Sequence, residues 1–328
     1  MEIRALDTYD TAQVAAWHCV LHDGYTSGRP PVWWSGLEAE THRFAHPAPY
    51  RERHVLVGVE HGEVVSATDV VLPLRENQHT ASVELAVRPD ARGAGHGRAL
   101  AGAVRRLLAD RGRTLVEAEV YALPGQPFEE SRSGRFALAQ GLRPGNVETR
   151  YLLDLRAHTA PPAPAVADDT EVVGWIGSTP PAYVDELLIL HRQMEQDVPR
   201  GELSREPLDL DLERLRTSQQ RLADTGWTSV TSLVLVGGEA AGYTEVLVHR
   251  DDEVMVQEDT LVLPAHRGRR FGQLLKTANL QRLEPVREGR TLLQTFTADS
   301  NTAMRATNTK FGFEPADVLY ECEGDVSA

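Results

Sequence analysis

Residues 87–100, VRPDARGAGHGRAL, are the stretch of this sequence that is most informative about its fold. A β-like run ends at Val87, and apolar residues with helical spacing continue from the glycines to Asp110. The chain therefore turns from a strand straight into a helix. Such a turn leaves the first N–H groups of the helix unpaired, and the helix dipole adds partial positive charge. Glycines let the backbone approach an oxygen-rich anion such as a pyrophosphate, so the stretch predicts an anion site.

The same pattern occurs a second time, in residues 262–275, VLPAHRGRRFGQLL, at an offset of 175 residues. Residues 62–70 match residues 238–246 at an offset of 176, so the register holds over a long segment. A solenoid would need more and shorter repeats. We therefore expect two copies of one fold.

A proline-rich segment separates the two copies. The chain has 328 residues, which is enough for about two domains with cores of their own. Residues 157–169, AHTAPPAPAVADD, contain three prolines and interrupt the apolar periodicity on both sides. Proline fixes φ and lacks an N–H donor, so we expect an extended linker. The expected domains are residues 1–156 and residues 170–328.

The overall charge and the cysteine count exclude several classes of protein. Lys and Arg total 34 against 48 Asp and Glu, which gives a net charge of −14 and disfavours binding to nucleic acid. The sequence has no apolar run long enough to span a membrane and no export signal, so we expect a cytoplasmic protein. Cys19 and Cys322 suggest no disulfide framework, and His42 and His46 lack a third ligand, so no metal is expected.

Each copy shows the same order of elements: a strand, two amphipathic helices, three strands, the glycine turn and its helix, a strand, a helix and a strand. This order predicts an α/β (α+β) fold, in which a mixed, twisted sheet is flanked by helices. In the first copy the expected elements are 2–6, 11–22, 37–45, 54–60, 63–72, 81–87, 95–110 and 114–121. Their counterparts are 171–175, 183–196, 210–224, 232–236, 240–248, 253–263, 271–283 and 291–297.

The loop with Arg92, Gly95 and Gly97 resembles the acyl-CoA signature of the GNAT N-acyltransferase superfamily, Gln/Arg-x-x-Gly-x-Gly/Ala. The second copy keeps Arg267 but has Arg270 at the place of the middle glycine. The resemblance implies tandem GNAT-like domains and a co-substrate, acetyl-CoA or another short acyl-CoA. The implied binding residues are Leu85, Ala86, Val87, Arg92, Gly93, Ala94, Gly95, His96, Gly97, Arg98, Leu261, Val262, Arg267, Gly268, Arg269, Arg270, Phe271, Gly272, Gln273 and Asn301.

The end of the second copy is similar to the last helix of this family. Asn301, Gly312 and Phe313 match the pattern. Asn308 stands where the family usually has the Tyr that protonates the departing thiolate, and the first copy has Ala137 there. The resemblance thus extends over both copies in the order of their elements, but both lack this tyrosine.

The reaction of the family requires a base, because an amine must lose a proton before it attacks a thioester. Glu84 and Asp259 hold equivalent positions, five residues before a proline, and Glu245 and Glu258 lie close to the second. Burial would raise the pKa of such acids toward neutrality. With Asn301, these four acids are the candidate catalytic residues.

The sequence therefore predicts an acyl-CoA-dependent N-acyltransferase that transfers an acetyl group to a small-molecule amine by direct attack. The two missing tyrosines leave an alternative, a catalytically silent CoA-binding sensor or scaffold. A third reading, a transferase that uses aminoacyl-tRNA, is disfavoured by the acidic charge. The intact phosphate loop favours the first copy as the active one, whereas the acids favour the second. The acceptor, the acyl length and the oligomeric state stay open.

Overall fold

The computed structural model describes residues 1–327, which form two compact units. Unit 1 comprises Met1–Thr149, Arg200–Glu206 and Ala316–Ala328, and unit 2 comprises Arg150–Pro199 and Pro207–Pro315. These units differ at their ends from the contiguous domains 1–156 and 170–328 that the repeat suggests. The reason is that two long strands, β7 (Arg143–Asp154) and β13 (Glu314–Asp325), each carry residues of both units.

Unit 1 has a mixed sheet with the order β1-β3-β4-β5-β6-β13, and β2 pairs with β4 at one side. All pairs are antiparallel except β5 with β6, and residues 318–325 of β13 pair along the whole of β6. Its elements are β1 (Glu2–Ala5), α1 (Thr11–Thr26), α2 (Leu37–Ala45), β2 (Arg51–His54), β3 (Leu56–Glu60), β4 (Glu63–Pro73), β5 (Thr80–Val87), α3 (His96–Asp110), β6 (Leu115–Ala122) and α4 (Arg132–Ala139).

Unit 2 repeats this plan with the order β8-β9-β10-β11-β12, and β7 follows β12. Here β11 and β12 form the parallel pair, and the neighbouring pairs are antiparallel. Its elements are β8 (Thr170–Ile176), α5 (Val184–Asp197), α6 (Leu212–Asp224), β9 (Trp227–Val236), β10 (Glu239–His249), β11 (Val254–Val262), α7 (Phe271–Leu283), β12 (Leu292–Ala298) and α8 (Thr302–Lys310).

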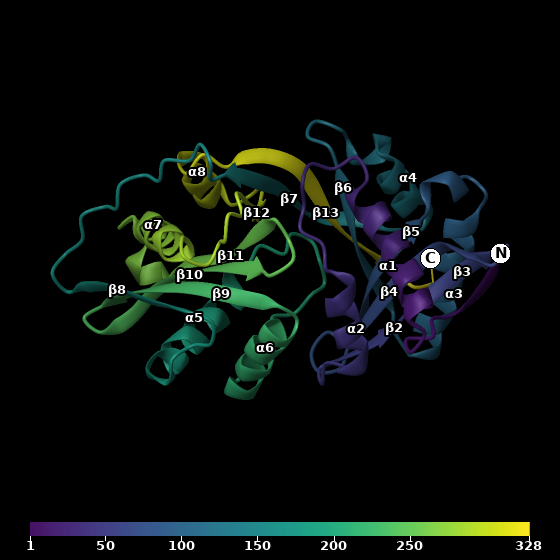
Figure 1. Cartoon of the computed structure of the whole chain (residues 1–328), viewed down its shortest axis with the longest axis horizontal. Coiled ribbons are helices and arrows are strands. Elements are labelled where there is room, and N and C mark those ends of the chain that lie inside the picture. Colours follow the sequence, from purple (N-terminus) through teal and green to yellow (C-terminus); the bar gives the residue numbers. More distant parts are fainter. Residues whose placement is uncertain (328) are drawn as a thin grey trace. The chain divides into compact units, whose positions relative to one another are not determined.

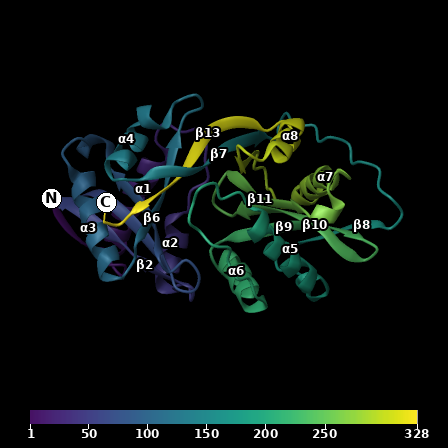
Figure 2. The ribbon, with the colours of Figure 1, turned by 180° about the vertical axis from the view of Figure 1, so that it is seen from behind.

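Helices cover both faces of each sheet, as the predicted fold class requires. In unit 2, α5 and α6 lie on one face and α7 and α8 on the other, and two opposite views agree on this (Figures 1 and 2). Leu187 and Leu190 of α5 pack on Leu233 and Leu261, whereas Leu275 of α7 packs from the opposite side. The two faces of the sheet thus carry separate apolar clusters.

The predicted fold class is confirmed, and several element boundaries agree closely. Helices α2 and α7 begin and end at the predicted residues. Strand β9 begins at Trp227, five residues before the predicted Ser232, because its polar Thr and Ser residues hide the strand pattern. Residues 51–54 form a separate strand, β2, which the sequence did not predict.

The linker, residues 157–169, contains no helix or strand and lies along the helices of unit 2. The side chain of Gln273 donates to the carbonyl of Pro162 at 2.8 Å, and Thr277 donates to that of Pro161 at 3.3 Å. The ring of His158 stacks on Phe311 after α8. The linker therefore covers one side of α7, which explains why its polar residues Gln273 and Thr277 are buried.

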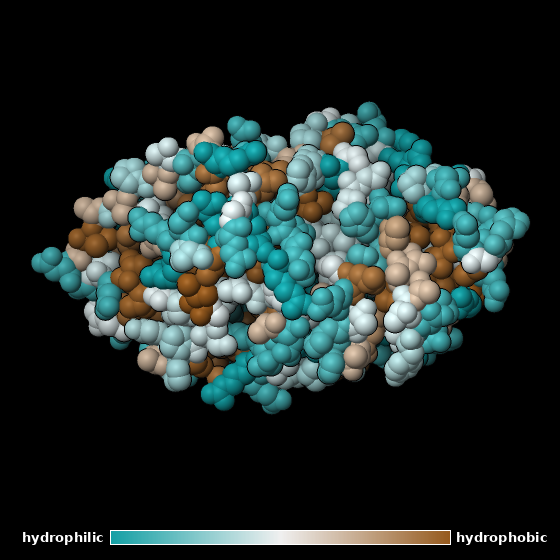
Figure 3. Space-filling view, viewed as in Figure 1, coloured by the Kyte–Doolittle hydropathy of each residue, from teal (hydrophilic) through white to brown (hydrophobic). Residues whose placement is uncertain are grey.

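None of the helices among residues 1–327 is long and apolar enough to cross a membrane. Hydrophilic and hydrophobic residues are interspersed over the face of the molecule in Figure 3.

Removing residues 316–328 should expose one edge of the unit 1 sheet. Residues 318–325 pair with β6, and Cys322 is buried in the cluster that contains Val70, Val116 and Leu142. We expect amide hydrogens of β6 to lose their protection against exchange in the truncated chain, whereas those of β9, between β8 and β10, keep theirs. Mass spectrometry measures both. Unchanged protection of β6 would contradict the assignment of β13 to unit 1.

Candidate functional site

The parallel strands of each unit separate at the same point. Strand β5 pairs with β6 only through Thr80–Ser82 and Leu115–Glu117, although both strands continue further. Strand β11 likewise pairs with β12 only through Val254–Val256 and Leu292–Gln294. Backbone groups beyond this point have no partner across the gap, so they can bind a ligand that enters between the strands. The predicted binding residues in this separated part are Leu85, Ala86, Val87, Leu261 and Val262.

Each diverging strand leads to a helix whose N-terminus is open to an anion. Gly95, which precedes α3, has φ +88°, and Arg270, which precedes α7, has φ +60°. Arg270 therefore adopts the left-handed conformation of the glycine that it replaces, at a cost that non-glycine residues pay there. Among the described residues, no side chain caps either helix, whereas Asn301 caps α8. The free first-turn N–H groups and the dipole favour an anion at both turns.

Arg92 and Arg267 hold these turns in the same way. Arg92 Nε donates to the carbonyl of Val87 at 3.0 Å, and Arg267 Nε donates to that of Val262 at 3.1 Å. The two arginines therefore occupy equivalent positions in the two turns, and Arg267 also forms an ion pair with Asp197.

The remaining loop residues divide into supporting and exposed groups. His96 is buried 3.4 Å from Glu60, and a Cβ at Gly97 would lie 3.2 Å from the ring of Phe136, so Gly97 allows α4 to pack closely. Gly93, Ala94, Arg98, Gly268, Arg269, Arg270 and Gly272 line the two turns, while Phe271 and Gln273 are buried at the start of α7.

In unit 1 the candidate base Glu84 lies opposite Asp69 in a regular antiparallel pair. Burial, together with the charges of Asp69 and Glu119, raises the pKa of Glu84 to about 8. Arg53 donates to both oxygens of Asp69, at 2.8 and 3.0 Å from Nε, and to Glu40 at 2.6 Å. The arginine thus compensates the neighbours of Glu84 rather than Glu84 itself.

Two tyrosine rings of unit 1, Tyr25 and Tyr121, form an aromatic cluster near Glu119, and the side chain of Arg29 occupies it. The guanidinium of Arg29 lies 3.6 Å from the ring centre of Tyr121 and 4.3 Å from that of Tyr25. Its Nε donates to Asp317 at 2.8 Å, and both side chains are buried. Tyr121 in turn donates to Glu119. Aromatic faces with nearby carboxylates are the usual receptors for a cation, and in unit 1 Arg29 occupies them.

Unit 2 differs because β11 contains a bulge. Thr244 is opposite Thr260 and Val246 is opposite Gln257, so Glu245 alone faces two residues, Glu258 and Asp259. A bulge of this kind re-aims side chains and is common beside active sites. The bulge therefore gathers the three acids that the sequence placed near one another.

Their environment keeps Glu245 and Glu258 partly protonated at neutral pH. Burial raises the pKa of Glu245 to about 7. Desolvation and the neighbouring Asp259 and Glu245 raise the pKa of Glu258, which still reaches solvent, to about 8. Burial also raises the pKa of Asp259, although Tyr243 donates a hydrogen bond of 2.7 Å to it. Thr231 donates to Glu245 Oε1 at 3.0 Å. Glu245 is therefore a base with one oxygen held in place.

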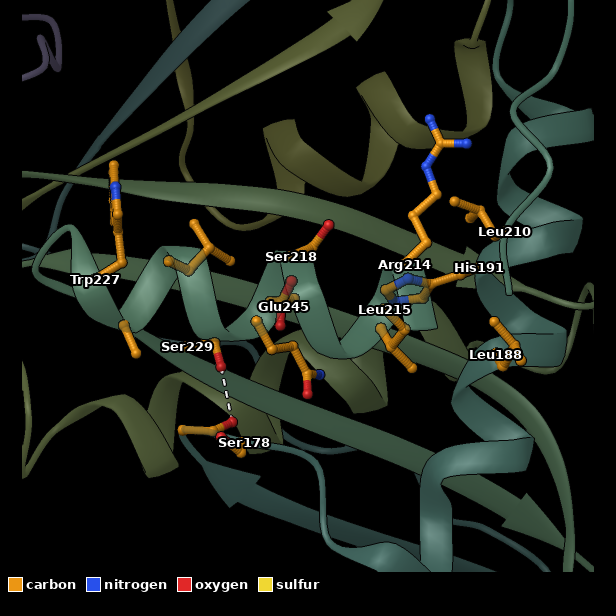
Figure 4. Close-up of a pocket in the computed structure, with 14 residues that line it drawn as sticks. Ser178, Leu188, His191, Leu210, Arg214, Leu215, Ser218, Trp227, Ser229 and Glu245 are labelled. Carbon is orange, nitrogen blue, oxygen red and sulfur yellow. Dashed lines mark hydrogen bonds between the residues drawn. The ribbon is translucent and has the colours of Figure 1, made fainter. Parts of the chain in front are cut away.

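A cavity of about 230 Å³ opens above Glu245, between the sheet and helices α5 and α6 (Figure 4). Among the described carboxylates of the cluster, Glu245 alone lines it. The other lining residues are Gly177, Ser178, Leu188, His191, Leu210, Arg214, Leu215, Ser218, Gln219, Leu222, Ala223, Trp227 and Ser229. Sequence reasoning missed this cavity, since His191 and the leucines look like ordinary residues of amphipathic helices.

The asparagines of the last helix have structural partners. Asn301 caps α8 by accepting the N–H of Met304 at 3.1 Å. Asn308, at the position where the family pattern has tyrosine, is fully buried and donates to Thr297 at 3.0 Å. An amide in this setting supplies no proton, so any proton donor for a leaving group must come from elsewhere.

Comparisons with known proteins agree with this architecture. The model of the acetyltransferase (GNAT) family matches residues 21–125, in the first copy. A solved structure, a tandem GNAT protein from the clavulanic acid biosynthesis pathway, is 27% identical and superposes with a TM-score of 0.84, covering 99% of this chain and 98% of that one. The chain has the fold of a tandem GNAT protein, and its first copy matches the family model.

Two more distant structures share the GNAT fold. A GCN5-related N-acetyltransferase from Sphaerobacter thermophilus is 19% identical with a TM-score of 0.67, over 99% of this chain and 95% of that one. A glucosamine N-acetyltransferase region of a fungal multi-domain β-N-acetylglucosaminidase is 14% identical with a TM-score of 0.63, over 98% of this chain and 38% of that one. No match was found among the curated proteins. GNAT proteins are acyltransferases that use an acyl-CoA, so this chain has the fold of such acyltransferases.

The turn before α3 can be tested with two substitutions of equal shape. Asp and Asn tolerate the left-handed conformation of Gly95 similarly well. Only Gly95→Asp places a negative charge at the helix N-terminus, where a phosphate of CoA would compete with it. We expect Gly95→Asp to bind CoA about tenfold more weakly than Gly95→Asn, or about 1.4 kcal/mol. Isothermal titration calorimetry measures the difference, and equal affinities would move the anion site away from this turn.

Proposed function

We propose that unit 2 catalyses the transfer of an acyl group, in the simplest case acetyl, from acyl-CoA to a primary amine. The observation that carries this proposal is Glu245, a carboxylate whose pKa is about 7, on the floor of a cavity and next to separated parallel strands. In the overall reaction the C–S bond of the thioester breaks, an amide C–N bond forms and the CoA thiol is released. An acid of this pKa is suited to accept the proton of the amine near neutral pH.

The residues of unit 2 suit an acyl-CoA. The open turn before α7 offers backbone N–H groups to the pyrophosphate, and Arg269 and Arg270 are exposed beside it. Backbone groups of β11 beyond Val256 have no partner on β12, so they are free to bind the extended arm and the thioester oxygen.

Within the cluster, the three acids divide the proton transfers. Glu245 binds the ammonium group of the acceptor and takes its proton. Glu258, whose pKa of about 8 keeps it mostly protonated near neutrality, supplies a proton to the departing thiolate in place of the missing tyrosine. It regains a proton from the attacking nitrogen, which loses its second proton as the amide forms. Asp259, held by Tyr243, keeps both pKa values high through its own charge.

In this proposal unit 1 binds a second acyl-CoA without catalysing transfer. Its loop has the full glycine pattern, but Arg29 occupies the aromatic cluster next to Glu119, where an amine would have to lie. A silent sensor or scaffold, in which neither unit catalyses transfer, is the alternative that the same experiments would reveal.

Isosteric substitutions distinguish the two units. Glu245→Gln removes the base and keeps its shape, so we expect kcat for thiol release to fall by about 100-fold or more. The same substitution at the candidate base of unit 1, Glu84→Gln, should leave kcat within about twofold. The reverse result would place catalysis in unit 1. Loss of activity in neither variant, or no thiol release by the unmodified protein with any amine, would overturn the proposed function.

The pH dependence gives a second check. We expect kcat/KM to rise with pH through about 7, because Glu245 must lose its proton before it can act as a base. It should fall again above about 8 as Glu258 loses the proton that it donates. The two limbs belong to a coupled cluster. Steady-state rates of Glu245→Gln should lose the acid limb and those of Glu258→Gln the alkaline limb. A profile that is unchanged in both variants would contradict these roles.

A further inference from the structure

The cavity in unit 2 has an apolar side, although serines, His191, Gln219 and Arg214 also line it. Leu188 of α5, Leu215 and Leu222 of α6, Leu210 before α6 and Trp227 at the start of β9 provide aliphatic and aromatic surface. Such a surface favours an apolar body and penalises hydroxyl or charged groups that find no partner there.

Glu245 is the carboxylate at the floor of this cavity, and no compensating cation faces it. The guanidinium of Arg214 points away from Glu245 (Figure 4), and its Nη1 donates to the carbonyl of Asp209 at 3.2 Å. Burial lowers the pKa of His191 to about 4, so this imidazole is neutral. A ligand therefore meets one negative charge, which suits a single ammonium group.

His191 has one unmet hydrogen bond. Its Nε2 is buried and has no hydrogen-bond partner among the residues that the structure describes. Its ring lies 4.9 Å from that of Tyr243, so the imidazole is held in place. A buried polar atom without a partner is costly, and this one has no surface open to the cavity, so a ligand gains no bond from it.

The volume limits the size of the ligand. A protein cavity of about 150 Å³ accepts benzene. The cavity of about 230 Å³ above Glu245 is about half as large again, which leaves room for a ring and a short amine-bearing arm.

We infer that the acceptor is a small arylalkylamine or a similar primary monoamine, with a mainly apolar, ring-sized body. This inference rests on the proposed function, because it assigns the cavity above Glu245 to the acceptor of the transfer. The ammonium group lies at Glu245, and the body lies against the leucines and Trp227.

A panel of four amines tests the chemical class. Phenethylamine and tyramine fit the cavity, putrescine carries a second charge, and glucosamine carries several hydroxyl groups. With saturating acetyl-CoA, we expect kcat/KM for thiol release to be at least about tenfold higher for the first two, since the others bury polar groups without partners. A preference for putrescine or glucosamine would overturn the inference and leave the proposed function intact.

Cavity-filling substitutions test the location. Leu222→Trp fills the cavity, whereas Ile189→Trp is a matched control, because Ile189 is exposed on α5 and does not line the cavity. We expect the KM for phenethylamine to rise about tenfold or more in the first variant and to stay within about twofold in the second. Ala223→Phe, at an exposed lining position, gives the same test with less risk to folding. Unchanged KM values in both filling variants would overturn the inference.

Calorimetric titration of phenethylamine, without acyl-CoA, separates binding from catalysis. Binding that Leu222→Trp or Ala223→Phe abolishes supports the inferred ligand class, even if no amine releases thiol, and in that case the proposed function alone fails. Absence of binding to the unmodified protein, together with thiol release from other amines, overturns the inference alone.

Discussion

The separation of two parallel strands is the constraint on which the rest of this structure depends. In both units the parallel pair holds for three ladder positions and then opens. An open ladder leaves backbone donors and acceptors that water or a ligand must satisfy. The helices that follow β5 and β11 begin beside the opening with uncapped N-termini, so unpaired donors gather at one place. A long, bent and anionic ligand is what such a gap and such a turn can hold together.

The two copies diverge where one residue is added to a strand. Strand β5 is regular, so Glu84 has one neighbour across the ladder, Asp69, and Arg53 compensates that neighbour. In β11 the bulge sets Glu245 against both Glu258 and Asp259. Two similar sequences therefore give different acid sites. In unit 1 an arginine pairs with the acid beside Glu84, whereas in the described part of unit 2 the three clustered acids have no such cation beside them. Like charges in a shared, buried place raise one another's pKa, which suits proton transfer near neutral pH.

Sequence reasoning predicted what is local and missed what is not. The ends of α2 and α7 follow from apolar periodicity and from the turn residues next to them. The place of β13 beside β6 depends on pairing between distant segments, which no local pattern encodes. Arg270 looked like a break in the loop pattern, yet its backbone keeps the shape of the glycine. Asn301 matched a family position, and the structure shows that its side chain caps α8.

The acid cluster and the cavity above it both favour proton transfer from an amine to Glu245 in the proposed reaction. A primary amine has a pKa of about 10.4, as in lysine, and an unperturbed glutamate lies near 4.3, so proton transfer between them spans about six pKa units. Because the pKa of Glu245 is about 7, that gap narrows to about three. The leucine walls narrow this pKa difference further, since they stabilise the neutral amine relative to the ammonium ion. In the proposed reaction, a cavity with leucine walls and one weakly acidic carboxyl therefore both selects an amine and lowers the cost of making it nucleophilic.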